Sequence, residues 1–179
     1  MNYLELSWPS LPDAMEAELL KLCLSDNEDR SEIYKNSKTL SQSDTEKRTF
    51  IQIDAPDYLK QWVTQNLKEI DDEYTVQLQI WQYSDYGVRH IDKRREYSYN
   101  YLLMEHPGIT RWFENDGTFI ESVNYQHKKW YKHIGSLKYH DVLHVNNFRP
   151  AVTIYKRIVI EDNERPLLWS MPTNLKHNT

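Results

Sequence analysis

His90 and Asp92 are the residues of this chain whose types and spacing are best suited to chemistry. They follow an alternating, β-rich stretch after a short turn around Gly87. In an extended segment, residues i and i+2 project to the same face, so this imidazole and this carboxylate can approach one cation. In a chain with 7 histidines and 27 acidic residues, such a triplet also arises by chance. The pair therefore predicts two metal ligands and requires a third.

Two histidines about 50 residues further along, His140 and His144, are candidates for the third ligand. Two imidazoles and one carboxylate on one face of a divalent ion leave its other coordination positions open, as in non-haem iron oxygenases. Both histidines fall on the same face of a strand, so alternation alone does not choose between them. The residues themselves leave this choice open.

The composition limits the protein class to which such a site can belong. The chain has 179 residues, 39% hydrophobic and 13% aromatic, enough for the core of a single folded domain. The formal net charge of -5 gives no general basic field, so nucleic acid is not the expected partner, although local basic runs leave it open. The single cysteine excludes a disulfide framework. The N-terminus lacks the pattern of a signal peptide and no stretch is apolar enough to span a bilayer, so we expect a cytoplasmic protein without membrane association.

The elements that must position the site change character near residue 74. Apolar residues at helical spacing predict helices over 11–24 and 57–70, separated by a polar stretch over 25–48. Short alternating segments then predict about seven strands, over 75–83, 97–103, 109–113, 118–125, 130–134, 141–145 and 151–160. No long helix interrupts them, which favours an antiparallel sandwich or barrel with the N-terminal helices on one face.

A series of motifs in this β-rich half resembles the iron(II)- and 2-oxoglutarate-dependent dioxygenase superfamily. The motifs that carry the likeness are Gln79-Ile-Trp-Gln-Tyr83, Gly87, His90-Ile-Asp92, Arg95, Ser98, Asn100, Tyr101-Leu102, Thr110-Arg-Trp112-Phe, His140-Asp-Val142 and Arg149. Their order is most similar to that of small aspartyl/asparaginyl- or prolyl-hydroxylase-like proteins of bacteria and phages. The likeness covers roughly residues 74 to 160, about half of the chain.

The resemblance implies a mainly β fold with N-terminal helices and a double-stranded β-helix core of the jelly-roll or cupin-like kind. We expect a single domain over 1–179, with a helical N-terminal support region over 1–73, the core over 74–160 and a C-terminal extension over 161–179. The implied activity is hydroxylation of an amino-acid, peptide or protein side chain, using Fe(II), 2-oxoglutarate and O2 and releasing succinate and CO2.

The resemblance also implies roles for individual residues. His90, Asp92 and His140 match the Fe(II) ligands, and the usual spacing to the later arginine favours His140 over His144. Arg149, nine residues after His140, matches the basic residue that binds the distal carboxylate of 2-oxoglutarate. Tyr83 and Asn100 match further co-substrate contacts.

Two other classes stay open at this level. A cupin-like binding protein, non-catalytic or with a different metal, would also show histidines in short strands, but it would not need Arg149 or Tyr83. A structural or interaction protein of a phage would use all of these residues as core and surface. Substrate identity and oligomeric state do not follow from the sequence.

Overall fold

Two helices and nine strands make up the described part of the chain. The structure is a computed structural model and describes residues 1–24, 50–81, 89–92, 95–134, 138–143 and 148–157. In chain order the elements are β1 (Tyr3–Leu6), α1 (Asp13–Leu24), β2 (Phe50–Asp54), α3 (Asp57–Asn66), β3 (Tyr74–Trp81), β4 (Arg95–Leu102), β5 (Ile109–Phe113), β6 (Phe119–Asn124), β7 (Trp130–His133), β8 (Tyr139–Leu143) and β9 (Arg149–Arg157).

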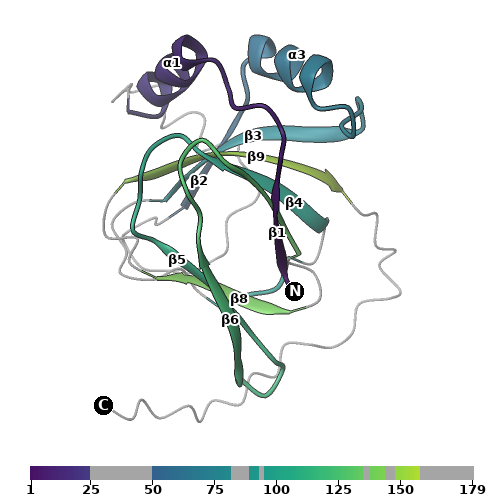
Figure 1. Cartoon of the computed structure of the whole chain (residues 1–179), viewed down its shortest axis with the longest axis vertical. Coiled ribbons are helices and arrows are strands. Elements are labelled where there is room, and N and C mark those ends of the chain that lie inside the picture. Colours follow the sequence, from purple (N-terminus) through teal and green to yellow (C-terminus); the bar gives the residue numbers. More distant parts are fainter. Residues whose placement is uncertain (25–49, 82–88, 93–94, 135–137, 144–147, 158–179) are drawn as a thin grey trace.

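The strands form two antiparallel sheets that face each other (Figure 1). The larger sheet has six strands in the order β1-β7-β4-β9-β3-β2, and the smaller has three in the order β6-β5-β8. An isolated antiparallel bridge between His90 and His140 adds the segment before β4 to the free edge of β8. From β4 onwards the chain crosses repeatedly between the sheets, since β4, β7 and β9 belong to the larger sheet and β5, β6 and β8 to the smaller. These crossings bring residues far apart in sequence to one place.

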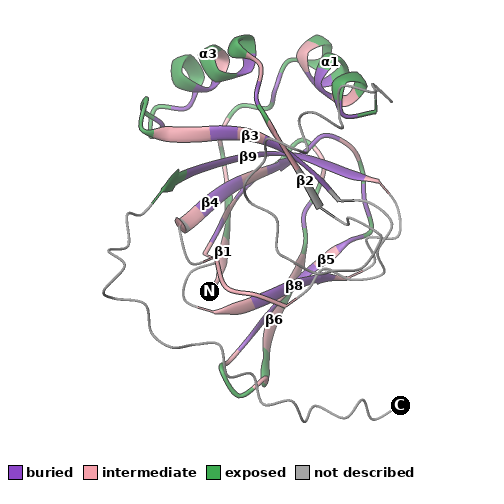
Figure 2. Cartoon of the chain, turned by 180° about the vertical axis from the view of Figure 1, so that it is seen from behind, coloured by how far each residue is buried: buried purple, intermediate pink, exposed green. Residues whose placement is uncertain are grey.

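The first hydrophobic layer lies between the larger sheet and the two helices. Both helices turn their buried side to β3 and β9 and their exposed side to solvent (Figures 1 and 2). In α3 the buried residues Leu59 and Val63 are four positions apart, which gives the helix one apolar stripe. The helix begins after Pro56, which has an extended backbone. It ends before Leu67, whose backbone is no longer helical but whose side chain is buried.

A second, smaller cluster fills the space between the two sheets. Its buried members come from both sheets and from the ends of their strands: Leu102, Trp112, Tyr125, Tyr131 and Ala151. Because side chains alternate along a strand, Tyr99 and Tyr101 of β4 pack on the helix side, while Leu102 faces the smaller sheet. The inner faces of the two sheets are therefore the surfaces on which a buried site can form.

The antiparallel β architecture with N-terminal helices confirms the fold class predicted from the sequence. All seven predicted strands are present, with bounds shifted by a few residues, and both predicted helices form. The N-terminal region also holds β1 and β2, which were not predicted. In β1, Tyr3 stacks on Trp112 with ring centroids 5.6 Å apart. The predicted polar stretch over 25–48 and the C-terminal extension lie outside the described residues.

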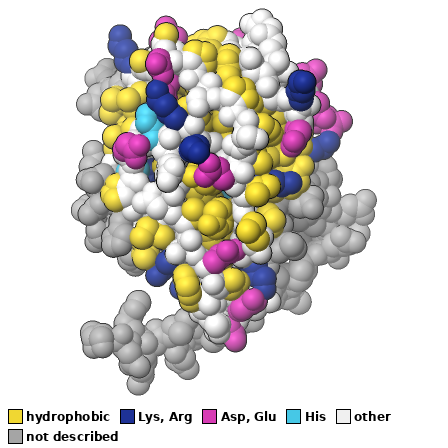
Figure 3. All heavy atoms as spheres, viewed as in Figure 1, with side chains coloured by type: hydrophobic (Ala, Val, Ile, Leu, Met, Phe, Trp, Pro, Cys, Tyr) yellow, Lys and Arg dark blue, Asp and Glu magenta, His cyan; other side chains and the backbone are white. Residues whose placement is uncertain are grey.

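Two surface properties bear on partners. No helix of the described ranges is both long and apolar enough to cross a bilayer. On the face shown in Figure 3, acidic and basic side chains are interspersed, and neither sign gathers into one patch. This agrees with the absence of a general basic field in the composition.

The packing of Trp130 gives a prediction about stability. Trp130 is fully buried between the sheet and the helices, lies against Trp8 and Tyr101, and donates a hydrogen bond from Nε1 to the Pro9 carbonyl oxygen at 3.0 Å. We expect Trp130→Ala to lower the free energy of unfolding by about 3–5 kcal/mol, because it leaves a large cavity. Urea denaturation measures this loss.

The matched control is Phe119→Ala, since the Phe119 side chain is 55% exposed. We expect this control to change the free energy of unfolding by less than about 0.5 kcal/mol. A loss below about 1 kcal/mol for Trp130→Ala would contradict the packing described here.

Candidate metal centre

The candidate ligands come from two segments that the smaller sheet brings together. His90 and Asp92 lie in the short extended segment before β4, and His140 lies in β8. The His90 backbone N–H donates to the His140 carbonyl oxygen at 2.9 Å, and the His140 N–H donates to the His90 carbonyl oxygen at 2.9 Å. This pair of bonds sets the two histidines opposite each other across two strands.

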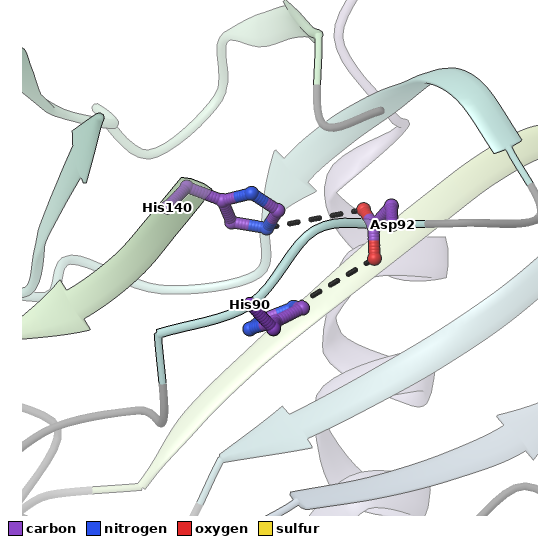
Figure 4. A group of neighbouring side chains, drawn as sticks. All are labelled: His90, Asp92 and His140. Atoms are coloured by element: carbon purple, nitrogen blue, oxygen red, sulfur yellow. Dashed lines mark ion pairs between the residues drawn. The ribbon is translucent and has the colours of Figure 1, made fainter. Parts of the chain in front are cut away.

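The three side chains converge on one point (Figure 4). One potential ligand atom from each of His90, Asp92 and His140 lies within 4.8 Å of the others. His90 Nε2 is 3.7 Å from Asp92 Oδ1, and His140 Nε2 is 3.9 Å from Asp92 Oδ2. Ligand atoms that each lie about 2.1 Å from one ion can be at most about 4.2 Å apart, so both distances suit a shared divalent cation.

His140 is held in a form that can bind a metal. Burial, followed by the neighbouring His90, lowers the pKa of the His140 imidazole to about 4, so the ring is neutral at pH 7. Its Nδ1 lies 3.4 Å from the Lys138 carbonyl oxygen, a long contact that favours the proton on Nδ1. The lone pair is then on Nε2, the atom that faces Asp92.

Asp92 is oriented by Arg95, which is among the residues that carry the family resemblance and lies three positions further along the chain. The Arg95 Nε lies 3.7 Å from Asp92 Oδ2, and its backbone N–H donates to the Asp92 carbonyl oxygen at 3.5 Å. The Arg95 guanidinium in turn lies 4.3 Å from the centroid of the Tyr155 ring. These contacts fix the carboxylate from the side of β4.

Arg149 begins β9 and points a cation into the buried interior. The residue is only 5% exposed, and its Nε has no hydrogen-bond partner among the described residues. Burial lowers the pKa of the Arg149 guanidinium to about 10, which leaves it charged at pH 7. Buried charges in proteins are normally paired, so this arginine is suited to pair with an anionic ligand.

His133 and Tyr125 belong to the same interior and were not singled out from the sequence. The His133 ring lies 4.5 Å from the His140 ring, and its Nδ1 forms a hydrogen bond of 2.9 Å with the Tyr125 hydroxyl. Burial, then the nearby His140, lowers the pKa of His133 well below its usual value, and Arg149 contributes in the same direction. The alternation Tyr131-Lys132-His133, with Tyr131 in the inner cluster, is the sequence signal that puts His133 on the inner face.

The other residues expected at the site have different outcomes. Asn100 donates from Nδ2 to Ser98 Oγ at 3.1 Å and accepts from Thr153 Oγ1 at 2.9 Å, so its amide already has two partners within the sheet. Its role as a co-substrate contact stays a prediction. Tyr83 and His144 lie outside the described residues. Among the residues that it describes, the structure brings His140 to the pair His90 and Asp92.

Comparison with known proteins finds likeness in structure but not in sequence. No protein-family model matches the sequence, and neither does any curated protein. Among solved structures, the chain is similar to a Pseudomonas putida prolyl-4-hydroxylase, with a TM-score of 0.51 and 18% identity over 88% of this chain and 93% of that one. It is also similar to a Trichoplax adhaerens prolyl hydroxylase solved with a peptide fragment of the hypoxia inducible factor oxygen degradation domain, with a TM-score of 0.56 and 13% identity over 86% and 82% of the two chains.

A third similar structure is a non-heme alpha-ketoglutarate-dependent epimerase of nogalamycin biosynthesis, with a TM-score of 0.53 and 8% identity over 87% of this chain and 78% of that one. At these identities the comparisons establish the fold. The chain shares its fold with these three proteins, and the mainly β, jelly-roll-like fold class predicted from the sequence is confirmed.

Proposed function

We propose that this protein is an iron(II)- and 2-oxoglutarate-dependent oxygenase that hydroxylates an amino-acid, peptide or protein side chain. The observation that carries the proposal is the convergence of His90, Asp92 and His140, with potential ligand atoms within 4.8 Å, in a fold shared with such enzymes. Two imidazoles and one carboxylate on one side of Fe(II) leave coordination positions for 2-oxoglutarate and O2.

The residues present suit both the metal and the co-substrate. The neutral imidazole of His140, the imidazole of His90 and the carboxylate of Asp92 form a donor set that non-haem iron accepts. The buried Arg149, whose Nε has no partner among the described residues, supplies a cation for the distal carboxylate of 2-oxoglutarate. A guanidinium and a carboxylate pair most strongly where water is excluded.

The chain's own residues would bind and orient the reactants. Bound Fe(II), with 2-oxoglutarate and O2, supplies the oxidation of a substrate C–H bond with release of succinate and CO2. Arg149 would fix the far end of 2-oxoglutarate and thereby direct its keto-acid end to the three ligands. Arg95 would hold Asp92 in place through its Nε, which lies 3.7 Å from Asp92 Oδ2. The backbone carbonyl oxygen of Lys138 would keep the Nδ1 of His140 protonated.

The substrate class is supported by the similar structures. Two of them are prolyl hydroxylases, and one of these was solved with a peptide bound. A peptide or protein side chain, or the corresponding free amino acid, is therefore the class that we propose.

An anaerobic titration tests the proposal directly. Fe(II) followed by 2-oxoglutarate should produce the weak visible charge-transfer band that arises when a keto acid chelates Fe(II). Succinate lacks the keto group and serves as the control, which should give no band. If wild-type protein gives no band at saturating Fe(II) and 2-oxoglutarate, the proposed function is wrong.

A further inference from the structure

Each of the two histidines has a sequence neighbour that points to the other face of the smaller sheet, away from the candidate metal centre. Arg89 precedes His90, and Asp141 follows His140. Because side chains alternate, a pair of inward histidines requires that their neighbours face outward. The outward neighbours form an ion pair of their own, in which Arg89 Nε lies 3.6 Å from Asp141 Oδ2.

Asp141 is a buried carboxylate held by a second arginine from β5. Its side chain is 6% exposed, and Arg111 donates from Nε to Oδ1 at 2.8 Å and from Nη2 to Oδ2 at 2.7 Å. This two-point contact has the fork geometry that gives arginine–carboxylate pairs their directional strength. The strand register sets Arg111 directly opposite Asp141, and Trp112 directly opposite His140.

Arg89 has a second anchor on the same outer face. Its guanidinium lies 3.5 Å from the centroid of the Phe113 ring, and Phe113 is buried in β5. Arg89 thus connects the segment that carries His90 to both β8 and β5. The same segment is also joined to β8 by the two backbone hydrogen bonds of the His90–His140 bridge and by contacts within the candidate metal centre.

The geometry points to Arg89, Arg111 and Asp141 as positioning residues for the metal ligands, a set that we call the outer clamp. The inference rests on the proposed function, because the clamp matters for chemistry only if His90 and His140 bind a metal. Asp141 is buried with two arginine partners, and because loss of a partner of a buried charge is costly, these contacts favour one geometry. The outer clamp holds His90 and His140 in register in the metal-free protein, so that metal binding requires little further ordering of these two ligands.

Arg89→Gln is the most direct test, because it removes the ion pair between the two segments while Asp141 keeps its partner Arg111. Two readouts are needed. Calorimetric titration with Mn(II) under anaerobic conditions should show affinity reduced about tenfold, the lower end of the range for residues that orient metal ligands. Hydrogen exchange of the His90 and His140 amides in metal-free protein should become about three- to tenfold faster, as expected for loss of one partly exposed ion pair and one cation–π contact.

Asp141→Asn removes the central charge and provides a second variant, in which both effects should be larger. The matched control is Glu16→Gln, since Glu16 is also a buried, ion-paired carboxylate, with His127 as its partner. It lies in α1, on the far side of the larger sheet from β8 (Figure 1). We expect this control to keep the wild-type Mn(II) affinity and the wild-type exchange at His90 and His140.

The two readouts separate the inference from the proposed function. If wild-type protein binds no Mn(II), the proposed function fails, while faster exchange in Arg89→Gln still supports the clamp. If wild-type protein binds Mn(II) but Arg89→Gln matches it in affinity and in exchange, the clamp is overturned. Equal losses in Glu16→Gln would also overturn it, because the effect would then reflect general stability.

Discussion

The His140→Ala variant is expected to bind Fe(II) at least about 100-fold more weakly than wild type, and to give no charge-transfer band with 2-oxoglutarate. Substitutions of residues that merely orient a ligand already cost about 10- to 100-fold in metal affinity, so loss of a ligand should cost more. His140 is also the ligand held most firmly, because it is buried and its Nδ1 contacts the Lys138 carbonyl oxygen. Anaerobic Fe(II) titration and visible spectroscopy measure both effects, and His90→Ala should behave alike.

Two further histidine variants make this result specific. His127→Ala removes a histidine that pairs with Glu16 of α1, away from the site, and should keep wild-type Fe(II) affinity. His144→Ala tests the alternative third ligand that alternation left open, and it should also keep the band. If His144→Ala loses the band and His140→Ala keeps it, our choice of third ligand is wrong.

Part of the candidate metal centre could be predicted from the sequence because that part obeys local rules. His90 and Asp92 share a face by strand alternation alone. His140 needed the resemblance, since nothing local links it to a residue 50 positions earlier, and the distance is closed only by the pairing of β8 with the segment before β4. The spacing from His140 to Arg149 is likewise local, because β9 is the next strand after β8 in the chain.

The features that escaped prediction depend on contacts between strands that are far apart in sequence. His133 contacts His140 only because β7 and β8 lie in different sheets that face each other. The strand β1 has only 4 residues, and it is defined by its pairing with β7, so its own sequence carries a weak signal. The outer clamp escaped for the same reason, since Arg89, Arg111 and Asp141 meet only once the register of β5 and β8 is known.

Burial of the Arg149 cation is unfavourable, and a bound anionic ligand would compensate it. A buried cation costs free energy unless an anion or several acceptors compensate it. In the described part of the chain, the Arg149 Nε has no hydrogen-bond partner, and the guanidinium carbon lies 5.9 Å from the centroid of the Tyr125 ring. The ligand-free protein therefore bears a free-energy cost that binding of a dicarboxylate would offset. Loss of the Arg149 charge should weaken binding of 2-oxoglutarate without destabilising the ligand-free protein.

Arg149→Met tests this expectation by removing the charge while keeping an unbranched apolar side chain. We expect 2-oxoglutarate to bind the Mn(II)-loaded variant at least about 30-fold more weakly, since losing one partner of a buried charge pair costs about 2 kcal/mol or more. The free energy of unfolding of the ligand-free variant should be no lower than that of wild type, because an uncompensated buried charge has been removed. Calorimetry and urea denaturation measure the two quantities.

Lys156→Met is the matched control for Arg149→Met, since Lys156 is an exposed cation of the same strand, paired with Glu73. It loses the same charge and should keep wild-type affinity for 2-oxoglutarate. The combination of weaker binding and undiminished stability is what separates a ligand-binding arginine from a structural one, because loss of a structural arginine would lower the free energy of unfolding as well. If Arg149→Met destabilises the ligand-free protein by several kcal/mol and binds 2-oxoglutarate as wild type does, Arg149 is a structural residue and the co-substrate site lies elsewhere.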